Sequence, residues 1–335
     1  MIRTTCLLLA FVFSLPILAP CSAACANEPG VVLQGAEGPG AGKHIVFVIG
    51  DEEYRSEESM PQLAKILAKH HGFKCTLLFA KNKQTGLVDP MMVDNIPGLE
   101  ALEDADLMVL FIRFRRLPEE QMQRILDYTN SGRPIVALRT STHAFNYKGQ
   151  SPLARWSWRS KDPKGGYGRA VLGETWIAHH GHHNVESTRA LPADGQEDHP
   201  ILQGVGEIWG PSDVYRITTL SGDSKPILTG YVLTGMKPDD PVNTEKPTMP
   251  VAWTKTYTGT EGKPSRVFTT TMGHAGDLKD PDFRRLLVNA CFWAMGMEDS
   301  IPERANVELV GPYDPLPIGF GGYRKGVRPE DHRLK

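Results

Sequence analysis

The sequence has little charge imbalance and few cysteines, and each shortage argues against a class of protein. Its 335 residues carry 37 Lys and Arg against 39 Asp and Glu, so the formal net charge is −2. No stretch is dense enough in Lys and Arg to neutralise a row of phosphates, which argues against a nucleic-acid binder. Only two of its five cysteines lie beyond the first 26 residues, and two do not make a disulfide framework in a chain of this length. With 40% hydrophobic residues, a globular chain with a large core remains.

The sequence also lacks apolar runs long enough to cross a bilayer, although a short apolar run lies at the N-terminus. The apolar run Cys6–Leu15 is followed by small residues up to Ala26. The run is too short to cross a bilayer, and the pattern is typical of a secretory signal peptide. We therefore predict that residues 1–26 are a signal peptide, and that the mature chain has no transmembrane span and is exported to the periplasm or outside the cell. A retained membrane anchor, or a lipid anchor at Cys21, is the alternative.

Signal-peptide cleavage near Ala26 would leave only Cys75 and Cys291. Cys75 lies in a predicted strand and Cys291 in a predicted helix, which is typical of buried, inert thiols. The sequence leaves open whether they form one bridge.

The first half of the chain alternates apolar strands with helical patterns. We predict a linker over 27–42 and a domain over 43–298. Helices are expected from Ser59, where Ser59 and Gln62 match a capping box, and from Pro118 at a first helical position. Buried strands are expected at 44–49, 73–79, 106–112 and 134–138. This order predicts an α/β fold with a doubly wound, mostly parallel sheet.

The second half has a different pattern, so we expect an elaboration of the sheet. Residues 144–184 show no period, and residues 282–296 predict a helix with one apolar face. Residues 299–335 are rich in Pro and Gly and predict an extended tail that either wraps the domain or frays. Strand-like segments lie at 215–219, 226–233, 250–257 and 266–271.

Charged and polar residues follow the predicted strands directly. Ligands of open α/β sheets bind outside the carboxyl ends of the strands. We therefore expect the substrate near the side chains that leave this edge, with Asp51, Arg139 and Thr140 orienting it. The residues at this edge are Asp51 after the first strand, Arg139, Thr140, Ser141 and His143 after the fourth, and His274 after the last.

Two imidazoles and a hydroxyl at this edge could carry catalysis. His143 and His274 are predicted to transfer protons or to form hydrogen bonds. Ser141 is a candidate nucleophile if His274 approaches it as a base, although its surroundings do not match the G-x-S-x-G elbow. A structural role for His143 is the alternative.

Residues 179–183 read His-His-Gly-His-His. Neutral imidazole is a common ligand of transition metals, so His180 and His183 are candidate ligands of a divalent transition metal. The alternative is a set of hydrogen-bonding histidines in a polar pocket. No other cofactor is indicated.

Aromatic residues are frequent in the same patternless region. Aromatic faces suit the apolar faces of sugar rings. Trp176, with Glu174 close to it, is therefore a candidate for substrate binding. The alternative is a loop packed on the sheet by its own aromatics.

Several of these segments together resemble the trehalose-utilisation (ThuA-like) family of the class I glutamine amidotransferase-like superfamily. The resemblance covers about 43–298 and implies a flavodoxin-like sheet and a role in carbohydrate utilisation. Among possible site residues of the family, the resemblance matches Gly273-His274 first, and it adds Asp213 to the substrate-binding candidates. The matching features are Ile45–Ile49 with Gly50-Asp51, the strand leading into Thr140–His143, His199-Pro200-Ile201, Asp213-Val214-Tyr215, Pro250-Val251-Ala252-Trp253, and Arg266-Val267-Phe268 before Gly273-His274.

The chain departs from the superfamily at the turn after the fourth strand. Thr140 stands where an amidotransferase has its cysteine, so glutamine amidotransferase chemistry is not expected. His143 lies three positions beyond the histidine that family members commonly carry near this turn. We expect an exported protein that acts on or binds a sugar or sugar derivative. The alternatives are a carbohydrate-binding protein without catalysis and a metal-dependent hydrolase centred on the histidine run.

Overall fold

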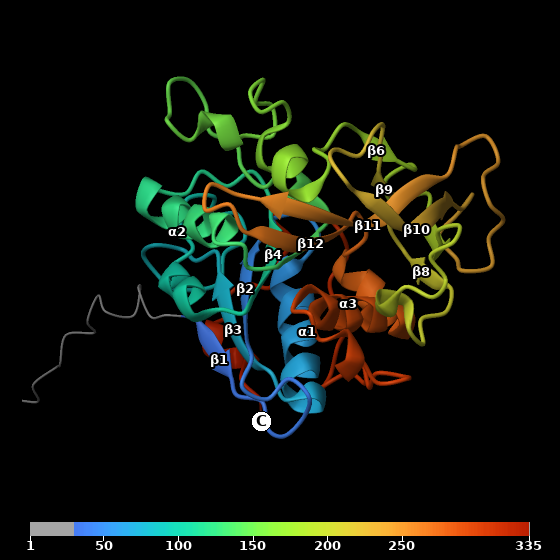
Figure 1. Ribbon diagram of the computed structural model, residues 1–335, viewed down its shortest axis with the longest axis horizontal. Coiled ribbons are helices and arrows are strands. Elements are labelled where there is room, and N and C mark those ends of the chain that lie inside the picture. The colour runs from blue at the N-terminus through green and yellow to red at the C-terminus, as the bar shows by residue number, and fades with distance from the viewer. Residues whose placement is uncertain (1–29, 335) are drawn as a thin grey trace, which may run out of the picture.

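The computed structural model describes residues 30–334, so the predicted signal peptide lies outside the described residues. These residues form a ten-stranded sheet, ordered β1-β3-β2-β4-β5-β12-β11-β10-β7-β8, and a separate two-stranded sheet (Figure 1). The strands of the first half are β1 (Val31–Leu33), β2 (His44–Gly50), β3 (Lys74–Phe79), β4 (Leu107–Ile112) and β5 (Ile135–Leu138).

Five neighbouring strands form a parallel flavodoxin-like core. β3, β2, β4, β5 and β12 (Pro264–Thr270) pair in parallel. Ile45 and Phe47 of β2 belong to one hydrophobic cluster, and Val46 and Val48 belong to another. Strands that are apolar on both faces need helices on both faces. The predicted α/β class is confirmed.

Three α-helices cover the two faces. α1 (Ser56–His71) and α3 (Pro281–Ala294) contribute to the same cluster as Ile45, whereas α2 (Glu119–Asn130) contributes to the opposite one (Figure 1). The C-cap of α1 is Gly72, which adopts the left-handed conformation.

The predicted start of α1 is wrong by one helical turn. The helix begins at Ser56, so the predicted cap Ser59 lies inside it and donates its hydroxyl to the carbonyl of Arg55, 3.3 Å away. The preceding turn is closed by Asp51, whose backbone amide donates to the Ser56 hydroxyl at 2.9 Å. The helix start is therefore set by the turn that the Asp51–Ser56 hydrogen bond closes, and the capping-box pattern at Ser59 does not determine it. α2 likewise begins one residue after Pro118.

The second half continues the same sheet with antiparallel strands. β11, β10, β7 and β8 extend it beyond β12 in antiparallel pairs. β7 and β8 were not predicted, and of the strand predicted at 215–219 only Tyr215 lies in a strand. The strands are β6 (His179–His180), β7 (Thr188–Pro192), β8 (Ile208–Gly210), β9 (Val214–Tyr215), β10 (Lys225–Val232) and β11 (Met249–Thr258).

Both ends of the described chain pack on the sheet. β1 lies within the segment predicted as a linker and pairs antiparallel with β3. Three residues give too short a pattern to be recognised in the sequence. The C-terminal tail wraps the domain: the Val327 carbonyl accepts from Val88 at 3.0 Å, and His332 stacks on Phe79.

The thiols of Cys75 and Cys291 are buried and free, and burial raises the pKa of both. Within residues 30–334, no helix combines the length and apolar character that crossing a bilayer requires.

Candidate functional site

A cavity of about 290 Å³ opens at the carboxyl edge of the parallel strands. It lies where the loops after β2, β4 and β5 meet the polar region of the second half. Aromatic side chains form much of its wall, and imidazole, carboxylate and guanidinium groups form the rest. The lining residues are Glu53, Tyr54, Arg113, Phe114, His143, Trp158, Arg159, Trp176, His179 and Tyr215.

His143 lies in the cavity wall, in the turn after β5. Its Nδ1 is 3.1 Å from the Thr142 hydroxyl, and its ring packs against Phe114 with centroids 4.9 Å apart. Burial lowers the pKa of His143 well below its usual value, and the charges of Arg113 and Arg139 add to the effect. His143 is therefore a neutral imidazole at neutral pH, suited to hydrogen bonding.

Arg139 is buried behind the residues of the cavity wall and does not line the cavity. Its guanidinium is fully buried and donates to the carbonyls of Asp213 at 2.8 Å and Thr271 at 3.1 Å. It also pairs with the Asp213 carboxylate at 3.3 Å and lies 3.7 Å from the Tyr54 ring centroid. These partners occupy the side chain that we predicted to orient substrate, so Arg139 positions Asp213.

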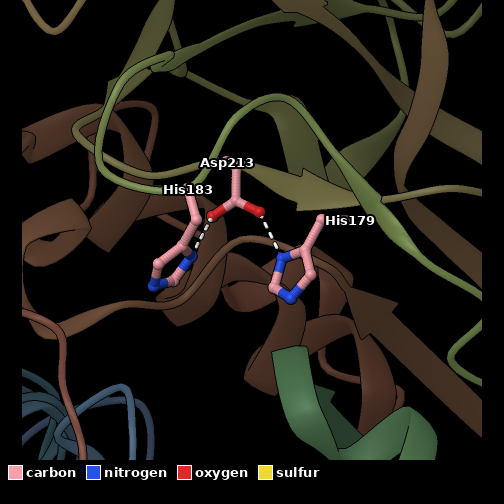
Figure 2. Close-up of side chains that lie close together, drawn as sticks. All are labelled: His179, His183 and Asp213. Atoms are coloured by element: carbon pink, nitrogen blue, oxygen red, sulfur yellow. Dashed lines mark hydrogen bonds and ion pairs between the residues drawn. The ribbon is translucent and has the colours of Figure 1, made fainter.

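The Asp213 carboxylate holds two histidines. Figure 2 shows one ring on each side of it, with His179 Nδ1 at 2.5 Å and His183 Nδ1 at 3.0 Å. Burial would raise the pKa of Asp213, but the hydrogen bonds from His179 and His183 and the charge of Arg139 outweigh it and hold the pKa well below its usual range. The hydrogen bond to Asp213 raises the pKa of His183. His179 extends from this pair into the cavity wall.

The same three side chains could hold a metal ion. One ligand atom from each of His179, His183 and Asp213 lies within 4.8 Å of the others. Two imidazoles and a carboxylate form a donor set for zinc or another transition metal. Arg139 opposes a cation here because it already places a positive charge beside Asp213.

His180, a predicted ligand, lies outside this group. Its Nε2 is 2.7 Å from the carbonyl of Pro247. Neighbouring residues of a strand point to opposite sides, so within β6 only one of His179 and His180 can face Asp213. The sequence could not show which one.

Glu174, a predicted substrate ligand, is fully buried outside the cavity wall. Its carboxylate accepts from Arg169 at 2.5 Å and from the amide of Thr175 at 2.9 Å. Trp176 lies in the cavity wall.

Asp51, Thr140 and Ser141 stabilise the strand ends instead of lining the cavity. Asp51 accepts from the amides of Glu53 and Tyr54 and, at 2.5 Å, from the Thr140 hydroxyl. The Ser141 hydroxyl donates to the Leu110 carbonyl at 2.8 Å. All three predicted residues are fully buried, and Ser141 is not placed as a nucleophile.

His274 caps a short helix and is absent from the cavity lining. Its Nδ1 accepts from the amide of Gly276 at 3.2 Å, while its own amide donates to Asp277 at 3.0 Å. Burial lowers the pKa of His274 to about 3, with the charge of Arg139 adding to the effect. The structure therefore does not gather His143 and His274 around one cavity.

Several lining residues were missed in the sequence. Glu53 was not among the candidates, but it lines the cavity, burial raises its pKa, and the Arg113 guanidinium lies 3.2 Å from it. Arg113 and Phe114 follow β4 directly, so their position after a predicted strand could have identified them as site residues.

Comparison with known proteins places the chain. The family model described as trehalose utilisation, ThuA, matches residues 44–294. The chain belongs to the ThuA family. The resemblance seen in the sequence is thus confirmed, and every cavity-lining residue lies within the matched range.

Two solved ThuA-like proteins are similar to this ThuA-family chain. The one from Parabacteroides merdae is 15% identical over 83% of this chain and 97% of its own, with a TM-score of 0.48. The one from Bacteroides uniformis is 16% identical over 77% and 93%, also with a TM-score of 0.48. No curated protein matches the chain.

Proposed function

We propose that this ThuA-family protein binds and transforms a sugar or sugar derivative in the cavity at the carboxyl edge. One observation carries the proposal: aromatic rings and polar side chains line the same small hollow. Phe114, Trp158 and Trp176 offer apolar surface to the faces of a sugar ring. Glu53 and Arg113 offer an acceptor and a donor to its hydroxyls.

His179 and His143 are the groups that act on the substrate in this proposal. The Asp213 carboxylate can only accept at His179 Nδ1, which fixes the proton there and leaves the lone pair on Nε2. His179 then serves as general base, with Asp213 orienting it, and neutral His143 provides a second hydrogen bond. His179 takes the role expected of His274, and Arg139 and Asp51 become positioning residues.

The test begins with a sugar screen by thermal shift, because a ligand of the folded state raises the apparent stability. With a sugar that is turned over, we expect His179→Ala and His143→Ala each to lower kcat by about 10²-fold or more. His182→Ala is the matched control, since this neighbouring side chain is exposed. Unchanged turnover in folded His179→Ala protein would contradict the proposed base.

Binding without catalysis is the alternative outcome of the same test. It requires saturable sugar binding that weakens in Trp176→Ala, together with no product when divalent metals are supplied. Such a result would leave the cavity assignment standing and remove the enzymatic step.

A metal-dependent hydrolase is the second candidate, and the grouping of His179, His183 and Asp213 favours it. For this candidate, tag-free protein should bind one Zn²⁺ per chain, and His183→Ala should lose that binding. His180→Ala is the control, because this histidine hydrogen-bonds a carbonyl elsewhere. Absence of stoichiometric metal after soaking in Zn²⁺ would count against this candidate.

We also propose that the protein is exported. The supporting feature is the N-terminal apolar run that ends in small residues near Ala26. Sequencing the N-terminus of the mature protein should give Asn27 first. A lipid-modified Cys21 would instead indicate tethering, and an intact Met1 in an unprocessed cytoplasmic fraction would refute export.

A further inference from the structure

A second, larger cavity adjoins the first. Its volume is about 600 Å³, and it lies among the loops of residues 146–162, drawn in green at the top of Figure 1. Phe114, Trp158 and Arg159 line both cavities, so the two lie side by side along one shared wall. We call this cavity the distal groove; its lining is Phe114, Asn146, Tyr147, Lys148, Ala154, Arg155, Ser157, Trp158, Arg159, Ser160, Lys161 and Asp162.

The distal groove is positively charged, although the whole chain is slightly negative. Four cationic side chains face a single carboxylate, Asp162. Among the described residues, none of the four cations forms an ion pair with a carboxylate, unlike most of the charged residues around the first cavity. The four are Lys148, Arg155, Arg159 and Lys161.

Aromatic rings lie beneath two of these cations. The Arg159 guanidinium is 4.2 Å from the centroid of Trp158, and the Arg155 guanidinium is 5.3 Å from that of Trp156. Stacking holds a guanidinium in place while leaving its N–H donors at the edge. A planar guanidinium can then bind a carboxylate or sulfate through two hydrogen bonds.

We propose that the distal groove is a second subsite that binds a negatively charged unit of a longer saccharide. The inference rests on the proposed sugar site, because it extends the same ligand past Trp158. The first cavity is small, about 290 Å³, and the second, about 600 Å³, leaves room for a further part of the same ligand. The charged group on that unit is a uronate carboxylate or a sulfate ester.

A saccharide fits better than a nucleic acid. The four cations gather in the lining of one groove, and Asp162 among them would repel a continuous polyanion. The shared aromatic wall also makes the groove an extension of a site for rings.

The test compares three disaccharides by calorimetry at low salt: neutral trehalose, an unsulfated uronate-containing disaccharide and its sulfated form. We expect the acidic ligands to bind at least tenfold more tightly than the neutral one, and the preference to weaken with added NaCl. Whichever of the two acidic disaccharides binds more tightly identifies the recognised group, the carboxylate or the sulfate. In Arg155→Gln/Lys161→Gln, the preference should fall below threefold.

The control variant Lys69→Gln/Arg304→Gln removes two exposed cations outside the groove and should keep the preference. If trehalose binds but the acidic disaccharides bind no more tightly, the distal subsite is refuted while the first cavity stands. If no sugar binds, the proposed function fails and this inference fails with it. Retention of the preference in the groove variant, or tighter binding of a single-stranded oligonucleotide than of any disaccharide, also overturns the inference.

Discussion

The two halves of the sheet bury their residues in different ways. All seven residues of β2 and all six of β4 are buried, whereas β10 alternates buried and half-buried positions towards its end and the last four residues of β11 are half-buried or exposed. The parallel half is enclosed between helices, and the antiparallel half carries polar loops. The parallel half thus supplies Glu53, Arg113 and His143 from its rigid edge, and the second half supplies His179 and further aromatic side chains placed against that edge.

The candidate site lies on the seam between the halves. Arg139 leaves the parallel strand β5 with φ of 44°, a left-handed conformation uncommon for a non-glycine residue. From there its guanidinium reaches Asp213 in the second half. One buried side chain therefore connects the sheet edge to the two histidines.

Breaking this connection should have the largest effect. Arg139→Met removes the buried cation beside the Asp213 carboxylate and the donor to two carbonyls, so we expect a loss of about 3–5 kcal/mol in the free energy of unfolding. Chemical denaturation measures it. Arg124→Met is the control, because its pair with Glu103 is exposed and should contribute less than about 1 kcal/mol. Equal losses in the two variants would contradict the claim that Arg139 connects the two halves of the sheet.

The halves should also respond oppositely to pH. In the parallel half, burial raises the pKa of Glu57 to about 8, and no described residue hydrogen-bonds its carboxylate. A raised carboxyl pKa means that the folded state holds the proton more tightly, so stability falls as pH rises from the unfolded pKa near 4.5 to about 8. Between pH 4.5 and 7 we expect Glu57 to cost about 3 kcal/mol. Glu57→Gln should remove this part of the pH dependence in urea melts.

Asp213 provides the opposite slope. Its lowered pKa means that its contribution is present above the unfolded pKa near 3.8 and is lost as pH falls below it. Asp213→Asn should reduce the loss of stability as pH falls below about 3.8. It should leave unchanged the loss of stability that Glu57 causes between pH 4.5 and about 8. Matching slopes in the two variants would refute this assignment.

A smaller effect is expected inside the parallel edge. Thr140→Val removes the hydroxyl that donates to Asp51 and leaves a buried carboxylate oxygen without that donor. We expect a loss of about 1–3 kcal/mol in the free energy of unfolding. Thr258→Val, at an exposed end of β11, should change it by less than about 0.5 kcal/mol.

The smallest predicted change concerns one imidazole. Asp213→Asn should lower the pKa of His183, because the hydrogen bond to the carboxylate is the main cause that raises it. NMR titration of the ring protons measures the change. In the native protein this pairing stabilises the fold below the unfolded histidine pKa and is lost as pH rises through the folded one. An unchanged His183 titration would show that Asp213 does not hold this ring.

The parallel half was largely predictable because continuous apolar runs such as Ile45–Ile49 have few alternative structures. The short strand β8 was not, since three residues with a half-exposed centre carry no distinct period. Predicting the carboxyl edge correctly did not separate lining residues from supporting ones. His143 and Arg139 lie four positions apart in one turn, yet only His143 reaches the cavity, and that difference depends on backbone conformation at Arg139.

The tail that wraps the domain has a consequence for how the cavity is completed. The Gly319 amide donates to the Glu53 carbonyl at 3.0 Å, Arg55 donates back to Gly319, and Phe320 packs against Arg113. Glu53 and Arg113 belong to the cavity wall, while Gly319 lies beyond the ThuA match. During synthesis, the wall can therefore reach its final form only after residues 319 and 320 have left the ribosome.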